Sequence, residues 1–126
     1  MLIDTDVLIW YMRGNVRAAK VLDQLPDPSL SIIVYMELVQ GMRNKRELKA
    51  LRETIGMWGA DILPINESIS HKAMFLVEQH FHSHSLRLAD ALIGATAIEH
   101  GQSLLTANIR HYRVIKGLML QPFRPE

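Results

Sequence analysis

The sequence contains no cysteine. Without thiols the chain can form neither a disulfide framework nor a thiolate zinc site, and the reducing cytosol is the simplest expectation. It also lacks any apolar run near the ~20 residues that span a bilayer. A signal peptide needs an uninterrupted apolar stretch, and Asp4 and Asp6 interrupt the one that begins the chain. We therefore expect a cytoplasmic protein that does not cross a membrane.

An excess of charge of either sign is missing too. The chain has 14 Lys and Arg residues against 13 Asp and Glu residues, which gives a formal net charge of +1 and a pI of about 8.1. This balance argues against a protein that coats nucleic acid through its net charge. It leaves room for a local basic groove.

What the sequence has is enough apolar material for one compact core. Hydrophobic residues make up 48% of the 126 residues, and no repeat, low-complexity tract or linker interrupts them. A chain of this length and composition predicts a single folded domain over residues 1–126.

Short apolar runs alternate with helical patterns along the chain. The apolar runs predict buried strands at 1–3, 29–34, 61–65, 103–107 and 118–121. Helical spacing predicts helices at 7–11, 16–25, 35–42, 45–58, 67–81 and 87–101. Strands that alternate with helices in this way indicate an α/β domain with a mostly parallel sheet.

Polar residues fall where the predicted strands give way to helices. Asp4 follows the first strand and Glu37 the second, Asp90 comes early in the 87–101 helix, and Asn108 follows the fourth strand. In parallel sheets, ligands bind beyond the carboxyl ends of the strands, so the fold can bring these side chains together. Carboxylate and amide oxygens, without cysteine, suit a hard cation such as Mg²⁺ or Mn²⁺.

Each of these residues also has a purely structural interpretation. Asp6 could cap the helix that follows it. Glu37, in the first turn of its predicted helix, and Asp90, near a cap, could simply favour the helix dipole. Asn108 could be a turn or cap residue before "IRHY". A purely structural account requires four polar residues to fall at strand-to-helix junctions by coincidence. A single site explains all four junction positions.

Four segments together resemble a PIN domain and, within that superfamily, a VapC-type toxin of a bacterial or archaeal toxin–antitoxin pair. In order they are "LIDTDVLIWY", "SIIVYMELVQGMRN", "LADALIGATAIEHG" and "LLTANIRHYRVI". The resemblance implies a three-layer α/β/α fold around a central, mostly parallel sheet. It also implies that Asp4, Glu37 and Asp90 hold Mg²⁺ or Mn²⁺.

The resemblance implies roles for the neighbouring positions as well. Asn108 matches the fourth metal position, which is often Asp, and a neutral amide there binds a cation more weakly. Thr5 and Ser31 match the hydroxyl residues that commonly flank the site. Asp6 stands where the family more usually has Asn or Ser.

The family activity that this resemblance implies is metal-dependent hydrolysis of single-stranded RNA. It further implies a homodimer and a VapB-type antitoxin, through which alone DNA would be contacted. Aromatic and Met residues favour interfaces, although an ordinary core position is an equal alternative here. The residues concerned are Trp10, Tyr11, Met12, Met57 and Trp58.

Basic residues near the acids are the candidates for holding RNA, because they would offset phosphate repulsion. Arg13 follows the first helix, Arg110 follows Asn108, and Arg43 opens a basic run that extends to residue 52. That run could equally be a solvated helix face.

Other interpretations remain open from the sequence. A PIN-fold module with weak or lost catalysis could bind RNA or a partner, and Asn108 leaves room for it. The "DTDVL" segment also resembles haloacid dehalogenase phosphatases, but Leu8 stands where that pattern wants Thr or Val. Histidines 80, 82 and 84 alternate, so a helix would splay them, and we expect structural or solvated side chains rather than a zinc site.

Overall fold

The centre of the molecule is a parallel sheet. The computed structural model describes residues 1–83 and 85–126. Its five strands lie in the order β3-β2-β1-β4-β5, and every neighbouring pair is parallel. The strands are β1 (Leu2–Ile3), β2 (Ser29–Ser31), β3 (Asp61–Leu63), β4 (Leu104–Thr106) and β5 (Leu120–Pro122).

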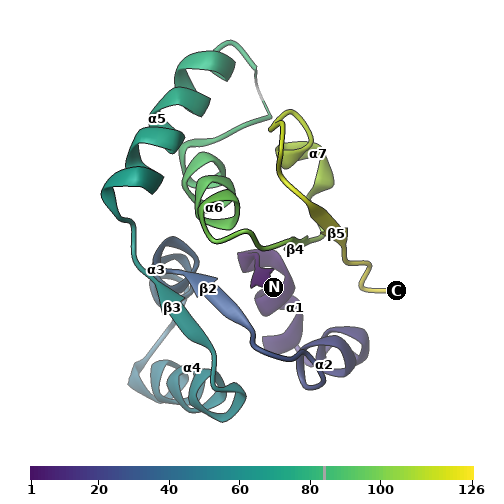
Figure 1. Ribbon diagram of the computed structural model, residues 1–126. Coiled ribbons are helices and arrows are strands. Elements are labelled where there is room, and N and C mark those ends of the chain that lie inside the picture. Colours follow the sequence, from purple (N-terminus) through teal and green to yellow (C-terminus); the bar gives the residue numbers. More distant parts are fainter. Residues whose placement is uncertain (84) are drawn as a thin grey trace.

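Helices cover both faces of this sheet. They are α1 (Thr5–Met12), α2 (Val16–Leu22), α3 (Ile32–Gln40), α4 (Lys45–Trp58), α5 (Glu67–His80), α6 (Leu88–Glu99) and α7 (Ile109–Tyr112). Parallel crossovers are almost always right-handed, and with this strand order they put α1 to α4 on one face and α5 to α7 on the other. These are the lower and upper groups of helices in Figure 1. The predicted three-layer α/β/α fold is confirmed.

The second strand is shorter than the sequence predicts. Its apolar run continues to Val34, but β2 ends at Ser31, whose hydroxyl accepts a hydrogen bond from the Ile33 amide at 3.1 Å and caps α3. Helix α3 therefore begins at Ile32 rather than at residue 35. Glu37 consequently lies in the second turn of α3, and its predicted place in the first turn is wrong.

Other boundaries move by smaller amounts, and one helix is new. Strand β3 ends before Pro64 rather than at residue 65, and α2 ends at Leu22 rather than at residue 25. The segment "IRHY" forms the short helix α7, which the sequence pattern does not predict. Helix α5 ends at His80, one residue before its predicted end; His82 is exposed, and His84 lies outside the described residues.

The middle of the sheet is the core. Strands β1, β2 and β4 are fully buried, whereas the edge strands β3 and β5 are mostly exposed. No helix in the described part of the chain has both the length and the apolar character that a membrane span requires. The buried centre fixes the ends of β1 and β4. Asp4 follows β1 and Thr106 ends β4.

Candidate active site at the carboxyl edge of the sheet

Asp4 lies at the end of the central strand and caps α1. Its Oδ1 accepts a hydrogen bond from the Thr5 amide at 2.8 Å, and its Oδ2 accepts one from the Thr106 hydroxyl at 2.7 Å. Only 5% of its surface is exposed. Burial raises the pKa of Asp4 above its ordinary value, hydrogen bonds oppose the rise, and the nearby charge of Asp90 adds to it.

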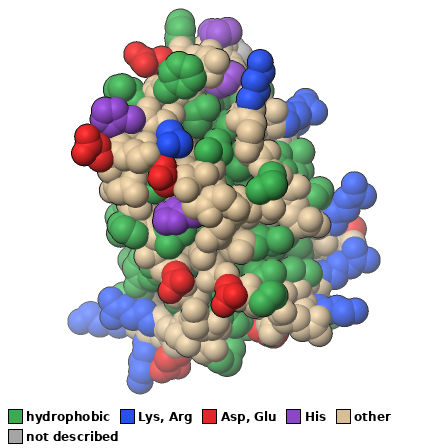
Figure 2. Space-filling model, viewed as in Figure 1, with side chains coloured by type: hydrophobic (Ala, Val, Ile, Leu, Met, Phe, Trp, Pro, Cys, Tyr) green, Lys and Arg blue, Asp and Glu red, His purple; other side chains and the backbone are tan. Residues whose placement is uncertain are grey.

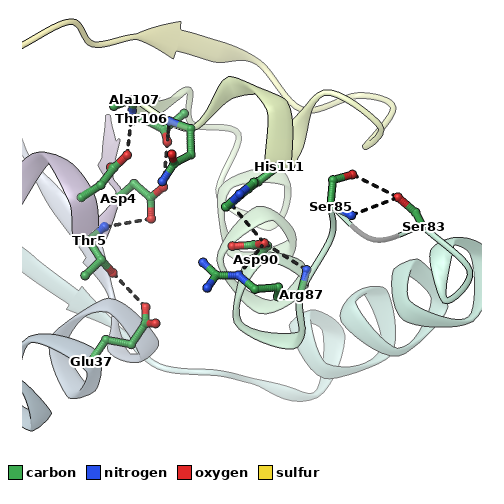
Figure 3. Close-up of polar contacts among 12 residues, drawn as sticks. Asp4, Thr5, Glu37, Ser83, Ser85, Arg87, Asp90, Thr106, Ala107 and His111 are labelled. Atoms are coloured by element: carbon green, nitrogen blue, oxygen red, sulfur yellow. Dashed lines mark hydrogen bonds and ion pairs between the residues drawn. The ribbon is translucent and has the colours of Figure 1, made fainter.

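Thr5 connects Asp4 to Glu37. Its hydroxyl donates to Oε1 of Glu37 at 2.8 Å, while its amide donates to Asp4. Glu37 reaches this position from the half-buried side of α3. One threonine thus orients two carboxylates that are far apart in the sequence, as Figure 3 shows.

Asp90 approaches from the opposite layer. It is the third residue of α6, is 2% exposed, and accepts a hydrogen bond from the Arg87 amide at 3.0 Å through Oδ2. The Arg87 guanidinium lies 3.5 Å and His111 Nδ1 3.7 Å from the same oxygen. Asp90 therefore does lie near the N-terminal cap of α6, as its structural interpretation predicts. In Figure 3 its carboxyl group nevertheless points toward the space beside Asp4 and Glu37.

The turn after β4 is fixed from two sides. The Thr106 hydroxyl donates to Asp4 and accepts from the Asn108 amide at 2.9 Å. Oδ2 of Asp6 accepts from the Ala107 amide at 3.0 Å. Asn108 occupies the N-cap position of α7, but its side chain is exposed and makes no capping bond.

Asp6 does not cap α1, so that interpretation is wrong. Asp4 takes the capping position, and Asp6 instead reaches across to the turn after β4. Its Oδ1 is buried and has no hydrogen-bond partner among the described residues. Burial, followed by the charge of Asp4, raises the pKa of Asp6 to about 7.

Sequence reasoning missed two residues of α7. Tyr112 is 1% exposed and lies beside Asp4 and Asp90; burial and then the charges of these acids raise the pKa of its phenol. The Nδ1 atom of His111 is buried and has no hydrogen-bond partner within the described part of the chain. Because α7 was not predicted, no periodicity placed these side chains against the acids.

The remaining predicted residues lie at or beyond the rim of the site. Ser31 is buried and caps α3, as described above. Arg13 and Arg43 line a groove of about 810 Å³ between α1, α3 and α4, which Glu37 also lines. Arg43 forms an ion pair with Glu47 at 2.7 Å. Arg110 is exposed on α7.

The same groove receives part of the predicted aromatic interface set. Tyr11, Met12 and Trp58 line it, and the rings of Tyr11 and Trp58 meet edge to face with centroids 4.9 Å apart. Trp10 is half-buried against the core, while Met57 is 70% exposed. This set is therefore divided between a groove, the core and the open surface.

The candidate ligand atoms of this site are carboxylate and amide oxygens, which suit a hard divalent cation. Asp4 and Asp90 are both buried, and their charges repel each other. Within residues 1–83 and 85–126, no three Asp, Glu or His side chains lie close enough to share one ion. Mg²⁺, however, usually binds one or two carboxylates and keeps several waters. A pair of buried carboxylates such as Asp4 and Asp90 meets that requirement.

The fold and this edge define a class: three-layer α/β proteins with a buried acidic site beyond the ends of parallel strands. Comparison with protein families is more specific. Residues 1–117 match the PIN domain, and the chain belongs to this family. The phosphatase interpretation is therefore wrong.

The relatives are VapC proteins. The chain is 32% identical over 124 residues to Ribonuclease VapC10 of Mycobacterium tuberculosis, across 94% of this chain and 90% of that one. It is 33% identical over 125 residues to Ribonuclease VapC1 of Rickettsia felis, across 94% and 92%. The predicted resemblance to VapC-type proteins is confirmed.

Solved structures share the fold. A toxin–antitoxin complex from Klebsiella pneumoniae superposes with a TM-score of 0.75 and 28% identity, over 99% of this chain and 97% of that one. VapBC2 from Rickettsia felis, bound to a DNA fragment from its promoter, gives a TM-score of 0.83 and 19% identity, with 98% of each chain covered. The second likeness concerns the fold alone.

Proposed function

We propose that this chain is an endoribonuclease that cleaves single-stranded RNA with Mg²⁺ or Mn²⁺, and that it is the toxin of a toxin–antitoxin pair. The observation that carries the proposal is the pair of buried carboxylates, Asp4 and Asp90, at the carboxyl edge of a parallel sheet. Its relatives named Ribonuclease VapC support the choice of RNA as substrate.

Asp4 and Asp90 would bind the cation directly, and Glu37, with Asn108 at the fourth position, would complete its coordination through the waters that Mg²⁺ keeps. When bound, such a cation polarises a phosphate oxygen and lowers the pKa of a bound water. The protein holds the carboxylates in place: Thr106 and the Thr5 amide orient Asp4, and the Arg87 amide orients Asp90.

Glu37 and Asp90 could also orient the attacking water. Each keeps one oxygen, Oε2 and Oδ1 respectively, that accepts no hydrogen bond from the described residues. Arg13 and Arg110, both exposed, are the proposed phosphate contacts. Arg43 could join them only by exchanging its ion pair with Glu47 for one with phosphate.

A cleavage assay tests the catalytic proposal. Antitoxin-free protein would be incubated with a mixed pool of single-stranded RNA in Mn²⁺, Mg²⁺ or EDTA. Asp90→Asn removes a buried carboxylate, and Asp61→Asn removes an exposed one at the start of β3 as the matched control. We expect cutting in both metals by the natural protein and by Asp61→Asn, and none with EDTA or with Asp90→Asn. Equal cutting by Asp90→Asn would remove that residue from the site.

We also propose a VapB-type antitoxin as the partner, since solved neighbours are toxin–antitoxin complexes. The groove between α1, α3 and α4 is lined by apolar residues, including Leu8, Leu38 and Leu51, and by Glu37. An amphipathic antitoxin segment could lie in it and direct an arginine to the carboxylates. Glu37→Gln should then weaken antitoxin binding in a direct binding assay, and undiminished binding by a Leu38→Asp variant that still folds would exclude this groove.

The homodimer is part of the same proposal. Large apolar side chains remain exposed on α4 and α5, among them Met57, Met74 and Phe75 at 70%, 57% and 58%. Aromatic and Met residues favour subunit interfaces. Light scattering of the antitoxin-free protein would give the mass directly, and a monomer at all concentrations would contradict the dimer.

One observation favours a second candidate, a PIN-fold module that binds RNA or protein without cleaving. Asn108 is neutral and exposed, so the fourth ligand position is weak. Calorimetric titration with Mn²⁺ separates the two candidates. A nuclease should show saturable binding that Asp90→Asn abolishes, whereas a degenerate module should show none.

A further inference from the structure

A second groove lies on the face of the sheet that α2 covers. Its volume is about 610 Å³, and its floor includes Leu25 of the segment after α2, Leu105 of β4 and Phe123 after β5. Arg17 and Lys20 of α2 and Arg124 of the C-terminal segment complete its wall. In Figure 2, Lys and Arg side chains project from the right-hand side, where Figure 1 places α2 and the C-terminus.

The charge of this groove is uncompensated. No Asp or Glu lines it. Arg17, Lys20 and Arg124 are exposed, and none has a carboxylate within 4.0 Å in the described part of the chain. Two arginines near the acidic site differ, since Arg43 is paired with Glu47 at 2.7 Å and Arg87 with Asp90 at 3.5 Å. An anion in this groove would therefore meet three cations without first breaking an ion pair.

The backbone that carries these cations is held in place. The Asn15 side chain accepts a hydrogen bond from the Ala18 amide at 2.9 Å and so caps α2. The same side chain donates to the Pro125 carbonyl at 2.9 Å. Asn15 thus ties the segment that bears Arg124 to the helix that bears Arg17, which fixes the two sides of the groove relative to each other.

The groove borders the acidic edge of the sheet through the backbone. The Phe123 amide donates to the Thr106 carbonyl at 2.8 Å, and the Asp4 amide donates to the Leu105 carbonyl at 2.9 Å. Two of its floor residues, Leu105 and Phe123, are therefore bonded to Asp4 and to its partner Thr106. A polyanion that approaches Asp4 and Asp90 is repelled by them, and cations elsewhere on the same molecule offset part of that repulsion.

We propose that this groove binds the phosphate backbone of the single-stranded RNA outside the cleavage site. The inference rests on the function proposed above and adds a binding site to it. The cations contact phosphates, and the apolar floor accepts the sugar and base surfaces that follow them. The site carries no base-reading function; it adds affinity to any single strand long enough to occupy it.

The test compares charge removal in the groove with charge removal elsewhere. The groove variant is Arg17→Gln, Lys20→Gln and Arg124→Gln combined, and all three residues are exposed. The control is Lys72→Gln and Lys116→Gln, because these two lysines lie outside this groove and outside the basic run that extends to residue 52. Binding of a labelled single-stranded RNA is followed by fluorescence anisotropy across a salt series in EDTA, so that no RNA is cut.

Three lost phosphate contacts should reduce the slope of log K against log salt by about 2, and weaken binding by roughly a hundredfold at about 0.1 M salt. The control should keep the natural slope. The proposal fails if the groove variant binds as the natural protein does, or if the control loses as much. It also fails if the groove variant keeps its affinity for RNA but loses affinity for an acidic peptide such as poly-glutamate, because the groove would then bind a protein partner.

Two checks keep the outcome interpretable. Should the triple variant fail to fold, Arg17→Gln and Arg124→Gln singly should each reduce the slope by about 0.7. Cleavage of the same RNA by the natural protein in Mn²⁺ is measured separately. If the natural protein cuts the RNA but the groove variant keeps the natural salt slope, the proposed groove is wrong and the nuclease proposal stands. If the groove variant has a reduced slope but the natural protein does not cut, the nuclease proposal is wrong and the groove proposal stands.

Discussion

The Thr106 hydroxyl joins the acidic site to β4, and Thr106→Val tests how much that contact stabilises the fold. The hydroxyl donates to Asp4 at 2.7 Å and accepts from the Asn108 amide at 2.9 Å, and the residue is fully buried. Valine has a similar shape, so the substitution removes these bonds and leaves no large cavity. The buried Thr96→Val is the control, because the Thr96 hydroxyl donates to the Leu92 carbonyl within a helix.

The expected cost follows from the charge on Asp4. A hydrogen bond to an ionised group contributes about 1.5–3 kcal/mol, and an orphaned partner adds about 1 kcal/mol. We expect Thr106→Val to lower the free energy of unfolding by about 2–4 kcal/mol in EDTA at neutral pH. For 126 residues this corresponds to a melting temperature roughly 8–15 °C lower. Thr96→Val should cost under about 1 kcal/mol, because it removes a neutral bond.

Urea denaturation of both variants across pH provides the assay. The folded pKa of Asp4 is raised, so its ionisation costs stability as pH rises through that pKa, and the Thr106 bond reduces this cost. The penalty of Thr106→Val should therefore shrink in acid, where Asp4 is protonated in both states. If Thr106→Val costs no more than Thr96→Val, or the same at every pH, the reasoning about this contact is wrong.

Three further results are expected. The pKa of folded Asp6 is raised to about 7, so ionisation of this carboxyl group should lower the stability of the protein as pH rises from about 4 to about 7. In EDTA, the melting temperature of Asp6→Asn should therefore change less over that range. At alkaline pH, Asp6→Asn should be more stable than the natural protein. Gly94→Ala should destabilise by about 1–3 kcal/mol in urea, because its Cβ would lie 2.8 Å from Cδ1 of Ile115, and Ile115→Val should recover part of the loss. Mn²⁺ should raise the melting temperature of the natural protein but not that of Asp90→Asn, and an equal rise in both would place the ion elsewhere.

The order of strands and helices was predictable because burial leaves a strong periodic signal. Apolar runs located all five strands, and the carboxyl-edge rule placed Asp4 at the end of the first strand, where it lies. The boundaries were less predictable, because Ile32 to Val34 are apolar and β-branched and so resemble a strand. The hydroxyl of Ser31 ends that strand by capping α3 instead.

Side-chain partners inside the site could not be predicted from spacing. Nothing in the sequence indicates that Asp6 bonds the Ala107 amide, since 101 positions separate them. The helix "IRHY" is too short to show periodicity, so the places of Tyr112 and His111 beside the acids were not predicted. The roles of Asp4, Glu37, Asp90 and Asn108 as ligands stay predictions, although the structure places each beside the edge where it was expected.

The central strand has a consequence for how the protein folds. Strand β1 spans two residues and pairs with β4, and the bond from Thr106 to Asp4 closes a loop of 102 positions. Contacts this distant in sequence form late and slow the folding of a domain. A chain that is still being synthesised therefore cannot assemble the edge until Thr106 has emerged. The acids would remain without this contact until then, and a chain that ends before Thr106 would carry no formed site.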